Sequence, residues 1–386
     1  MGHICNGTPY IRRVDSIFPC QGADGDLGKE RSEKATVQPG TREQRCAREG
    51  FIKTLTETSS QTYRLPDVGV AIVASRKGMV AKWGLGLLIL LGPCNALSAQ
   101  SLAPRAYVIT PQDANAITVT WSYYSGGVNF NGTIPITGAT GTYSVPVLSY
   151  YRSFSFFGRS ANITGFLPYG VGTFQGSVLG THRQVYRSGL LDLGFRFSVN
   201  LKGGPAMRPQ EFAKWKQKML LGVSVTVIPP TGQYDPMHLV NWGINRWAVK
   251  PELGYSQRWG HWLLDGYGGV WFYTANDAFY SLPEPQPQTE NPIGSFEGHL
   301  SYDFNKLRCW ASLDGNYWFG GATSLNGIAN LLTKQKSSRI GGTASFPITE
   351  RQSIKVSYSN GAYIRFGGNY QSVSVAWQYS WVGKLL

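Results

Sequence analysis

Hydrophobic and polar residues alternate along the second half of the chain, and the clearest example lies near the C-terminus. Between Ser372 and Trp381 the apolar positions are Val373, Val375, Trp377, Tyr379 and Trp381, and the residues between them are small or polar. Because a strand sends successive side chains to opposite faces, this segment predicts a strand with one apolar and one polar face. About ten residues is also the length of a tilted strand that spans a membrane.

The same alternation recurs in the segments 191–199, 296–304, 313–319 and 354–358. Their second faces carry polar and charged side chains. A dry protein core cannot accept charges on strand after strand, whereas a barrel lumen can, with the apolar faces turned to lipid. The pattern therefore predicts an all-β fold, a transmembrane antiparallel up-and-down β-barrel.

Twelve strands are expected, with fourteen as the alternative count. Long connections at 125–144, 170–185, 230–245, 274–292, 320–336 and 361–368 alternate with short turns near Gly158, Gly260, Lys306 and Glu350. This order is typical of outer-membrane barrels, which have long outer loops and short periplasmic turns. The connection from Leu201 to Lys216 is long for a periplasmic turn, and Pro209 suits the first turn of a short helix there. The predicted strands are 116–124, 145–156, 159–169, 186–200, 217–229, 246–258, 261–273, 293–304, 308–319, 337–348, 351–360 and 369–381.

A secretory signal peptide is predicted over residues 79–98. Lys82 precedes an apolar run that is too short to cross a bilayer, and Ala96 and Ser98 offer a cleavage site, with cleavage after Ala99 as a close second. We expect translation to begin at Met79 and residues 1–78 to be a polar extension without a core. The alternative is a cytoplasmic N-terminal domain. The expected mature chain has a short periplasmic segment at 99–115, the barrel at 116–381 and a tail at 382–386.

Composition agrees with this picture and excludes several other functions. Charged residues make up 15% of the chain, aromatic residues 13%, and there are 47 glycines, which suits short amphipathic strands. The net charge is +14, but the basic residues are scattered, so no nucleic-acid partner is expected. Beyond the signal segment only Cys309 remains, and no metal-ligand spacing or nucleotide loop occurs. We expect no metal, no cofactor and no enzyme activity.

Charged and aromatic side chains on the polar strand faces are the candidate site. Their simplest role is mutual neutralisation inside a narrow lumen, and the sharper one is a polar constriction that orients a solute. Inward aromatic rings would favour an aromatic or amphipathic solute. The lumen-facing candidates are Asp192, Arg196, Lys250, Glu252, Asp265, Tyr267, Trp271, Glu297, His299, Asp303, Asp314, Arg339 and Lys355, with Tyr273 as a further inward aromatic.

Several segments resemble one known family of bacterial outer-membrane transporters, whose members carry the description "putative MetA-pathway of phenol degradation". The resemblance covers about residues 101–381 and implies a barrel related to the fatty-acid and toluene channels of outer membranes. Such barrels commonly end on an aromatic residue, whereas here Val382 to Leu386 follow Trp381. The segments are Val145-Pro-Val-Leu-Ser-Tyr-Tyr, Phe157-Gly-Arg-Ser-Ala-Asn, Leu167-Pro-Tyr-Gly, Phe195-Arg-Phe-Ser-Val-Asn-Leu, Pro229-Pro-Thr-Gly-Gln-Tyr-Asp-Pro, Asn245-Arg-Trp-Ala-Val-Lys-Pro-Glu, Gly298-His-Leu-Ser-Tyr-Asp and Ser374-Val-Ala-Trp-Gln-Tyr-Ser-Trp.

The expected function is passive uptake of small hydrophobic or aromatic compounds through the bacterial outer membrane. One alternative is a structural or surface barrel without transport. A second is an outer-membrane lipid hydrolase, which would need a serine beside a histidine on the lipid-facing surface. Here His299 and Ser301 share the lumen face instead. The expected partners are outer-membrane lipid, a small hydrophobic or aromatic solute and the barrel-assembly machinery, which would bind the C-terminal strand.

Overall fold

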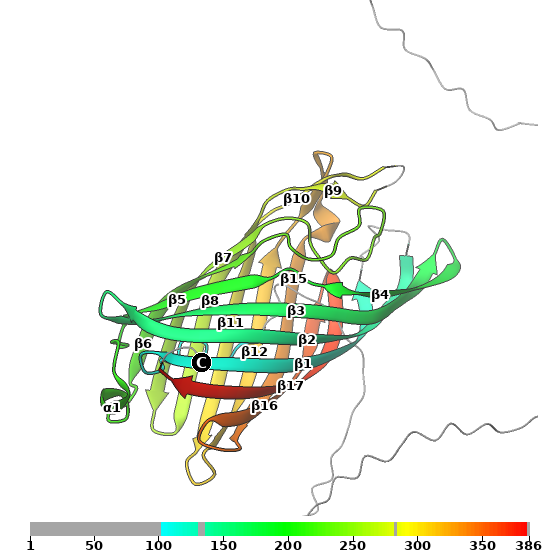
Figure 1. Cartoon of the computed structure of the whole chain (residues 1–386). Coiled ribbons are helices and arrows are strands. Elements are labelled where there is room, and N and C mark those ends of the chain that lie inside the picture. Colours follow the sequence, from blue (N-terminus) through cyan, green and yellow to red (C-terminus); the bar gives the residue numbers. More distant parts are fainter. Residues whose placement is uncertain (1–101, 130–135, 282–283, 384–386) are drawn as a thin grey trace, which may run out of the picture. The chain divides into compact units, whose positions relative to one another are not determined.

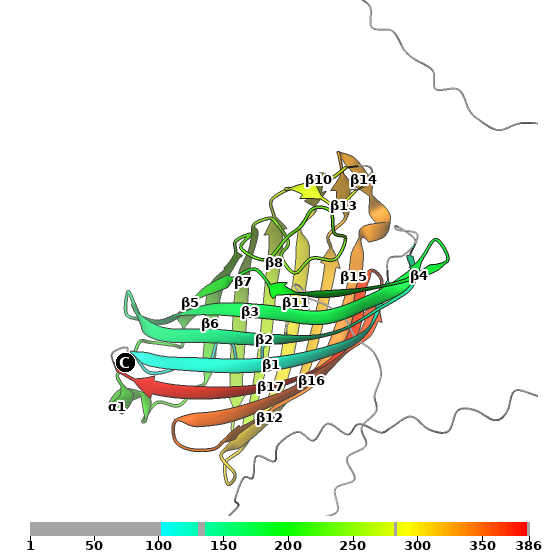
Figure 2. The same ribbon diagram turned by 45° about the vertical axis from the view of Figure 1, so that its right-hand side comes forward.

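The computed structural model describes residues 102–129, 136–281 and 284–383. The predicted signal peptide and the extension before it lie outside the described residues. Within the described part, twelve strands form a closed antiparallel barrel, which Figures 1 and 2 show in two orientations. The predicted fold class is confirmed, and the count is twelve and not fourteen.

The barrel closes between the first and the last strand of the described chain. Strand β1 pairs along its full length with β17 on one side and with β2 on the other. The twelve wall strands are β1 (Ala114–Asn129), β2 (Ile136–Phe156), β3 (Arg159–Val178), β5 (Gly194–Lys202), β6 (Met219–Ile228), β7 (Ala248–Trp259), β8 (Trp262–Tyr273), β11 (Ile293–Phe304), β12 (Cys309–Gly320), β15 (Gln335–Pro347), β16 (Gln352–Ile364) and β17 (Gly367–Val382).

The remaining elements lie in the connections. Strand β4 (Thr181–Leu190) extends the sheet by pairing with β3 alone, and a small sheet of β9 (Asn276–Phe279), β10 (Gln286–Glu290), β13 (Thr323–Leu325) and β14 (Ile328–Asn330) stands at the same end of the barrel (Figure 1). The 3-10 helix η1 (Leu331–Thr333) follows β14. At the opposite end, α1 (Pro209–Phe212) is the short helix expected at Pro209, and the Glu211 side chain accepts a hydrogen bond from the backbone N–H of Arg208 at 2.9 Å. No described helix has the length and apolar content needed to span a membrane.

Three predicted outer loops are instead mostly strand. The described parts of 125–144, together with 170–185 and 361–368, continue the wall strands beyond the alternating segments, and the chain turns sharply, for example, at Leu179 and Gly180, where φ is positive. Backbone hydrogen bonds between neighbouring strands continue there although the alternation stops, because the ladder needs no apolar face once it leaves the membrane. Sequence alternation therefore marked the membrane-spanning part of each strand and missed its extension.

The prediction of one continuous strand over residues 186–200 is wrong, because there is a break in the strand between β4 and β5. Asp192 lies in this break, where its carboxylate accepts backbone N–H groups from Gly232 and Ile244, each at 2.7 Å. These two bonds hold the 230–245 connection against the wall. Asp192 is therefore an anchor for a loop and not a lumen-facing strand residue.

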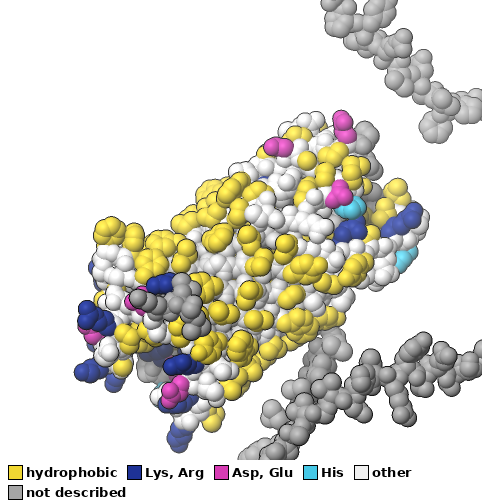
Figure 3. Space-filling model, in the orientation of Figure 1, with side chains coloured by type: hydrophobic (Ala, Val, Ile, Leu, Met, Phe, Trp, Pro, Cys, Tyr) yellow, Lys and Arg dark blue, Asp and Glu magenta, His cyan; other side chains and the backbone are white. Residues whose placement is uncertain are grey.

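The predicted faces of the last strand agree with the structure. Val375 and Trp377 are exposed on the outside, while Ala376 between them is only 3% exposed. A hydrophobic belt covers the visible side of the barrel, with charged side chains gathered at its two ends (Figure 3). This distribution is the one expected of a wall in contact with lipid.

The segment before β1 departs from expectation. Residues 99–115 were predicted to lie in the periplasm, outside the barrel. Residues 102–113 instead cross the inside of the barrel, and we call them the internal strap. Tyr107 and Ile109 are 1% and 3% exposed, which no extended periplasmic segment would be. The strap is held by wall residues far away in sequence, which is why local pattern did not reveal it.

Candidate functional site

A network of charged side chains lines one side of the lumen at mid-height. Lys250 Nζ lies 2.5 Å from a carboxylate oxygen of Glu252 on its own strand and 3.2 Å from one of Glu297 on β11. Arg196 on β5 reaches Glu252 at 3.4 Å. Because burying a lone charge is costly, pairing is what allows these groups to face inward.

The network continues onto β12 and β15. His299 Nδ1 is 2.9 Å from Asp314, and its other ring nitrogen is 3.6 Å from Glu297. The Thr343 hydroxyl donates to the second carboxylate oxygen of Asp314 at 2.7 Å. Arg339, 2% exposed, donates to Ser359 at 2.9 Å. These side chains come from four neighbouring strands, β11, β12, β15 and β16, and the pairing of those strands brings them together.

The internal strap binds this charged side through its residues 105–107. Arg105 forms an ion pair with Asp303 at 2.6 Å, and its backbone N–H donates to Asp265 at 3.3 Å. The backbone N–H of Ala106 donates to the Tyr267 hydroxyl at 3.0 Å. Arg258 also pairs with Asp303, so two cations share that carboxylate. The strap is therefore tied to β7, β8 and β11 by polar contacts.

Tyr107 is the deepest anchor of the strap. Its hydroxyl is 2.9 Å from Ser224 Oγ and donates to Glu252 at 3.1 Å. Gly222 and Gly254, neighbours in register on β6 and β7, provide the room: a Cβ at Gly254 would come within 2.1 Å of the ring. Burial, followed by the charge of Glu252, raises the pKa of the Tyr107 phenol, so it stays a neutral hydrogen-bond donor.

Aromatic clusters fill the lumen towards the end that carries the small sheet. Tyr143, Tyr370 and Trp242 pack together, with Tyr143 and Trp242 centroids 5.8 Å apart. A second cluster contains Trp271 and Trp318. Trp242 belongs to the 230–245 connection, so Asp192 and this ring together fold that loop into the barrel mouth. The passage at this end is bordered by apolar rings.

Above the second cluster, Arg246 pairs with Glu290, a residue of the small sheet. Burial raises the pKa of the Glu290 carboxyl, although the Arg246 charge opposes that shift. Arg246 also lies over the Tyr273 ring, 4.4 Å from its centroid. This pair fixes the small sheet to the barrel rim.

The opposite side of the lumen is formed by β16, β17, β1 and β2, and we call it the hydroxyl wall. Its inward residues include Ser122, Ser357, Ser359, Ser372 and Ser374, of which Ser374 donates to Ser122 at 2.8 Å and Ser359 contacts Ser372 at 2.8 Å. Lys355 and Gln378 on this wall are solvent-exposed although their positions alternate with lipid-facing residues. Water therefore reaches this wall near the β15–β16 turn, whereas Ser122 and Ser359 further along it are only 6% and 8% exposed.

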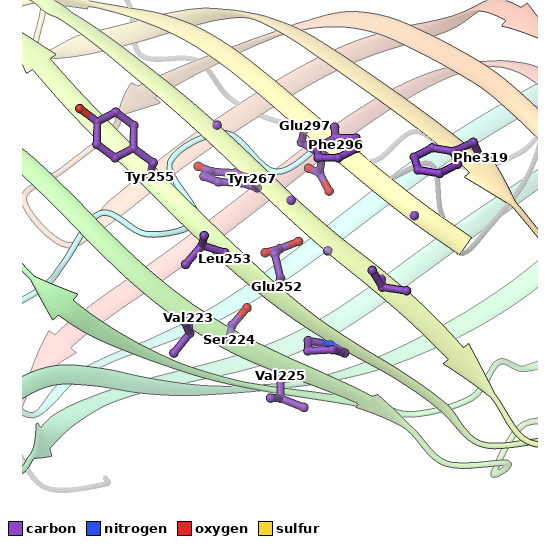
Figure 4. Close-up of a pocket in the computed structure, with 16 residues that line it drawn as sticks. Val223, Ser224, Val225, Glu252, Leu253, Tyr255, Tyr267, Phe296, Glu297 and Phe319 are labelled. Atoms are coloured by element: carbon purple, nitrogen blue, oxygen red, sulfur yellow. The ribbon is translucent and has the colours of Figure 1, made fainter. Parts of the chain in front are cut away.

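The outside of the charged side carries a shallow groove. Val225, Leu253, Phe296 and Phe319 surround it (Figure 4), and Gly268 is among the glycines that line it. The inward residues Glu252, Tyr267 and Glu297 belong to β7, β8 and β11, three of the five strands that line the groove. Apolar and charged side chains are thus separated by the thickness of one sheet, as the alternation predicted.

The predicted site residues fall into three places. Asp192 lies in the β4–β5 break. Lys355 lies alone on the hydroxyl wall. The others are on the charged side, either in the network or beside the strap or, for Trp271, in the aromatic cluster: Arg196, Lys250, Glu252, Asp265, Tyr267, Trp271, Glu297, His299, Asp303, Asp314 and Arg339.

Sequence reasoning missed Arg105 and Tyr107, which complete the charged side. One signal was present: Gly222 and Gly254 occupy inward positions where neighbouring strands carry polar side chains, and such a gap indicates that something else fills the space. Nothing in the sequence named the filler. Among the described residues no group of three or more acidic, histidine or cysteine side chains has a metal-binding arrangement.

Known proteins similar to this chain are outer-membrane barrels. Residues 126–375 match a family model described as "Putative MetA-pathway of phenol degradation". The COG4313 outer membrane channel from Pseudomonas putida F1 has the same fold, with a TM-score of 0.60 and 17% identity over 73% of this chain and 100% of that chain. The β domain of the Bordetella autotransporter BrkA follows at 0.41 and 12%, covering 69% and 99%. No curated protein matches the chain.

Proposed function

Since the chain belongs to the family described as "Putative MetA-pathway of phenol degradation", which residues 126–375 match, we propose that it is an outer-membrane channel for passive uptake of small hydrophobic or aromatic compounds. The family description names a pathway and not a solute. The proposal therefore depends on the lumen of this chain, which is polar, closed by aromatic rings at one end and open to water at the other end of the hydroxyl wall.

The observation that carries the proposal is the asymmetry of the lumen. Charged side chains and the strap occupy one side, whereas Lys355 and Gln378 on the other side are solvent-exposed. A twelve-stranded barrel encloses more space than one of eight strands and less than a general porin. Strap and aromatic clusters narrow it further, so we expect a small passage that admits single small molecules.

Aromatic rings at the barrel mouth support the choice of solute class. Tyr143, Tyr370, Trp242 and Trp271 form buried clusters, 2–8% exposed, at the end through which a solute would enter. A solute that enters there has to part these rings, and an aromatic solute can replace their ring contacts, whereas a small ion gains nothing from them. The charged network deeper in the lumen would then disfavour long apolar molecules without a polar group.

Reconstitution in liposomes tests the proposal. The folded protein should give small ion currents and faster entry of small aromatic compounds, such as toluene and phenol, than protein-free liposomes. A sugar of similar mass serves as the hydrophilic comparison. Entry of the sugar at the same rate as the aromatic compounds would contradict the solute class, and a current like that of a general porin would contradict the narrow passage.

One observation favours a non-transporting structural barrel as the second candidate. The strap and the aromatic clusters leave many inward side chains almost inaccessible, such as His299 and Trp318 at 1% and 0% exposure. The absence of both current and solute flux in a correctly folded barrel would favour this candidate. The lipid hydrolase gains no support, because Ser301 is 0% exposed and lies on the lumen face.

A further inference from the structure

The two sides of the lumen differ in charge as well as in access. On the charged side, acidic and basic groups neutralise one another through short ion pairs. Strands β16, β17, β1 and β2 contain two charged residues between them, Arg152 and Lys355, and both are basic. Arg152 alternates with inward Tyr151 and Ser153, and it pairs with Asp113 at 3.4 Å near the end of the barrel. Lys355 therefore supplies the whole formal charge of the accessible wall.

Lys355 points into the lumen. Its sequence neighbour Val356 is 39% exposed on the lipid side, and Tyr358, two positions further on, is 43% exposed on the same side. In register, Lys355 lies opposite Ala376 on β17 and Ser345 on β15. The surrounding positions are small, so the long side chain extends over them into accessible space.

The Lys355 ammonium group has no hydrogen bond or ion pair to any described residue. Its charge interacts with Asp314. That carboxylate is already engaged by His299 at 2.9 Å and by Thr343 at 2.7 Å. The other lumen lysine, Lys250, is held between two glutamates. The charge of Lys355 in the lumen is thus available to pair with a solute that passes through.

We propose that Lys355 is the selectivity residue of the passage, and that it binds the carboxylate of a small organic anion travelling along the hydroxyl wall. This inference rests on the proposed channel function and adds a charge to the solute class. A carboxylate accepts hydrogen bonds from an ammonium group, and the field of an unpaired cation in a narrow, low-dielectric passage concentrates anions. Serine hydroxyls beside it can donate to the same oxygens. The apolar part of an aromatic carboxylate suits the rings at the mouth.

Ion selectivity in planar lipid bilayers tests this inference. With a KCl gradient across the bilayer, the wild-type channel should show a reversal potential of the sign given by chloride preference. Lys355→Gln should bring the potential close to zero, and Lys355→Glu should reverse its sign. Lys355→Arg keeps the charge and should retain chloride preference. Arg152→Gln removes the same charge from a position that does not face the lumen, and it should leave the potential unchanged.

Benzoate supplies the second readout. Millimolar benzoate should reduce the chloride current of the wild type and of Arg152→Gln, and it should have much less effect on Lys355→Gln. Folding of every variant is checked by its shifted mobility on unheated gels. Cation preference in the wild type, or a selectivity that Lys355→Gln leaves unchanged, would overturn the inference while uptake of neutral aromatic compounds could still support the channel. Folded protein without any current or flux would overturn both.

Discussion

Adjacent residues of one wall strand face lipid and lumen water in turn, so the same substitution should have different effects at neighbouring positions. Val375 is exposed on the lipid side, whereas Ser374 faces the hydroxyl wall. Val375→Arg should lower the free energy of unfolding by about 2–4 kcal/mol if the residue lies near the bilayer midplane. Ser374→Arg should cost less, because the guanidinium reaches lumen water. Ala376 is unsuitable as the inward control, since it is almost fully buried.

The measurement is equilibrium unfolding in urea with the protein in lipid vesicles. Tryptophan fluorescence follows the transition in each variant. Equal loss of stability in Val375→Arg and Ser374→Arg would argue against the assignment of the two faces.

Asp192 shows where residue-level prediction fails. Alternation placed it on the inner face of one long strand, but the strand ends before it. The residues from Leu190 to Gly194 have the local pattern of a strand. The strand ends because the Asp192 carboxylate instead accepts hydrogen bonds from backbone N–H groups of a loop about forty residues later, at Gly232. By contrast, alternation predicted the inward direction of Lys250, Glu297 and His299, because in these cases the pleat of a regular strand alone decides the side.

Removing that carboxylate should loosen the loop and leave the barrel intact. In Asp192→Ala two backbone N–H groups lose their acceptor, a cost of about 1–3 kcal/mol each when they stay buried. We expect faster trypsin cleavage at Arg246 with unchanged far-ultraviolet circular dichroism. Asp277→Ala, at an exposed position of the neighbouring small sheet, is the matched control. Equal protection of Arg246 in both variants would show that Asp192 does not hold the loop.

At the scale of elements, the sequence predicted wall strands well and lumen contents poorly. A wall strand can be recognised from its own residues, because apolar and polar positions alternate along it. The internal strap has no such pattern, because its contacts are with residues of many strands, among them β2, β6, β7, β8 and β11, and each contact is of a different kind. Arg105 needs Asp303, and Tyr107 needs the gap at Gly254. Such complementarity exists only once β6, β7, β8 and β11 have paired side by side.

If polar contacts hold the strap in the lumen, breaking one of them should let the strap move and widen the passage. Arg105→Ala removes a charge-assisted hydrogen bond, which should cost about 1.5–3 kcal/mol. Asp303 keeps Arg258 as a partner, so no carboxylate is left unpaired. We therefore expect a stable barrel with larger or more fluctuating current. Arg208→Ala, on the exposed connection outside the barrel, is the control, and a current equal to that of the wild type would show that Arg105 does not restrict the passage.

At the scale of the whole molecule, processing and fold should agree. The predicted cleavage site lies before the strap in the sequence, so the mature chain would keep the whole described strap. We expect N-terminal sequencing of protein purified from outer membranes to begin near Ala99. Peptides from residues 1–78 in the same fraction would contradict the predicted signal peptide.

The seam between β1 and β17 joins the two ends of the barrel sequence. Asn115 donates to the backbone of Gly383, a separation of 268 residues. Folding rates fall as contacts become more distant along the chain, so the slow step should be closure of this seam, after the other hairpins have formed. The strap leads directly into β1, and it must lie inside before the seam shuts. The strap therefore has to bind the wall while the sheet is still open, so the final structure requires a fixed order of folding steps.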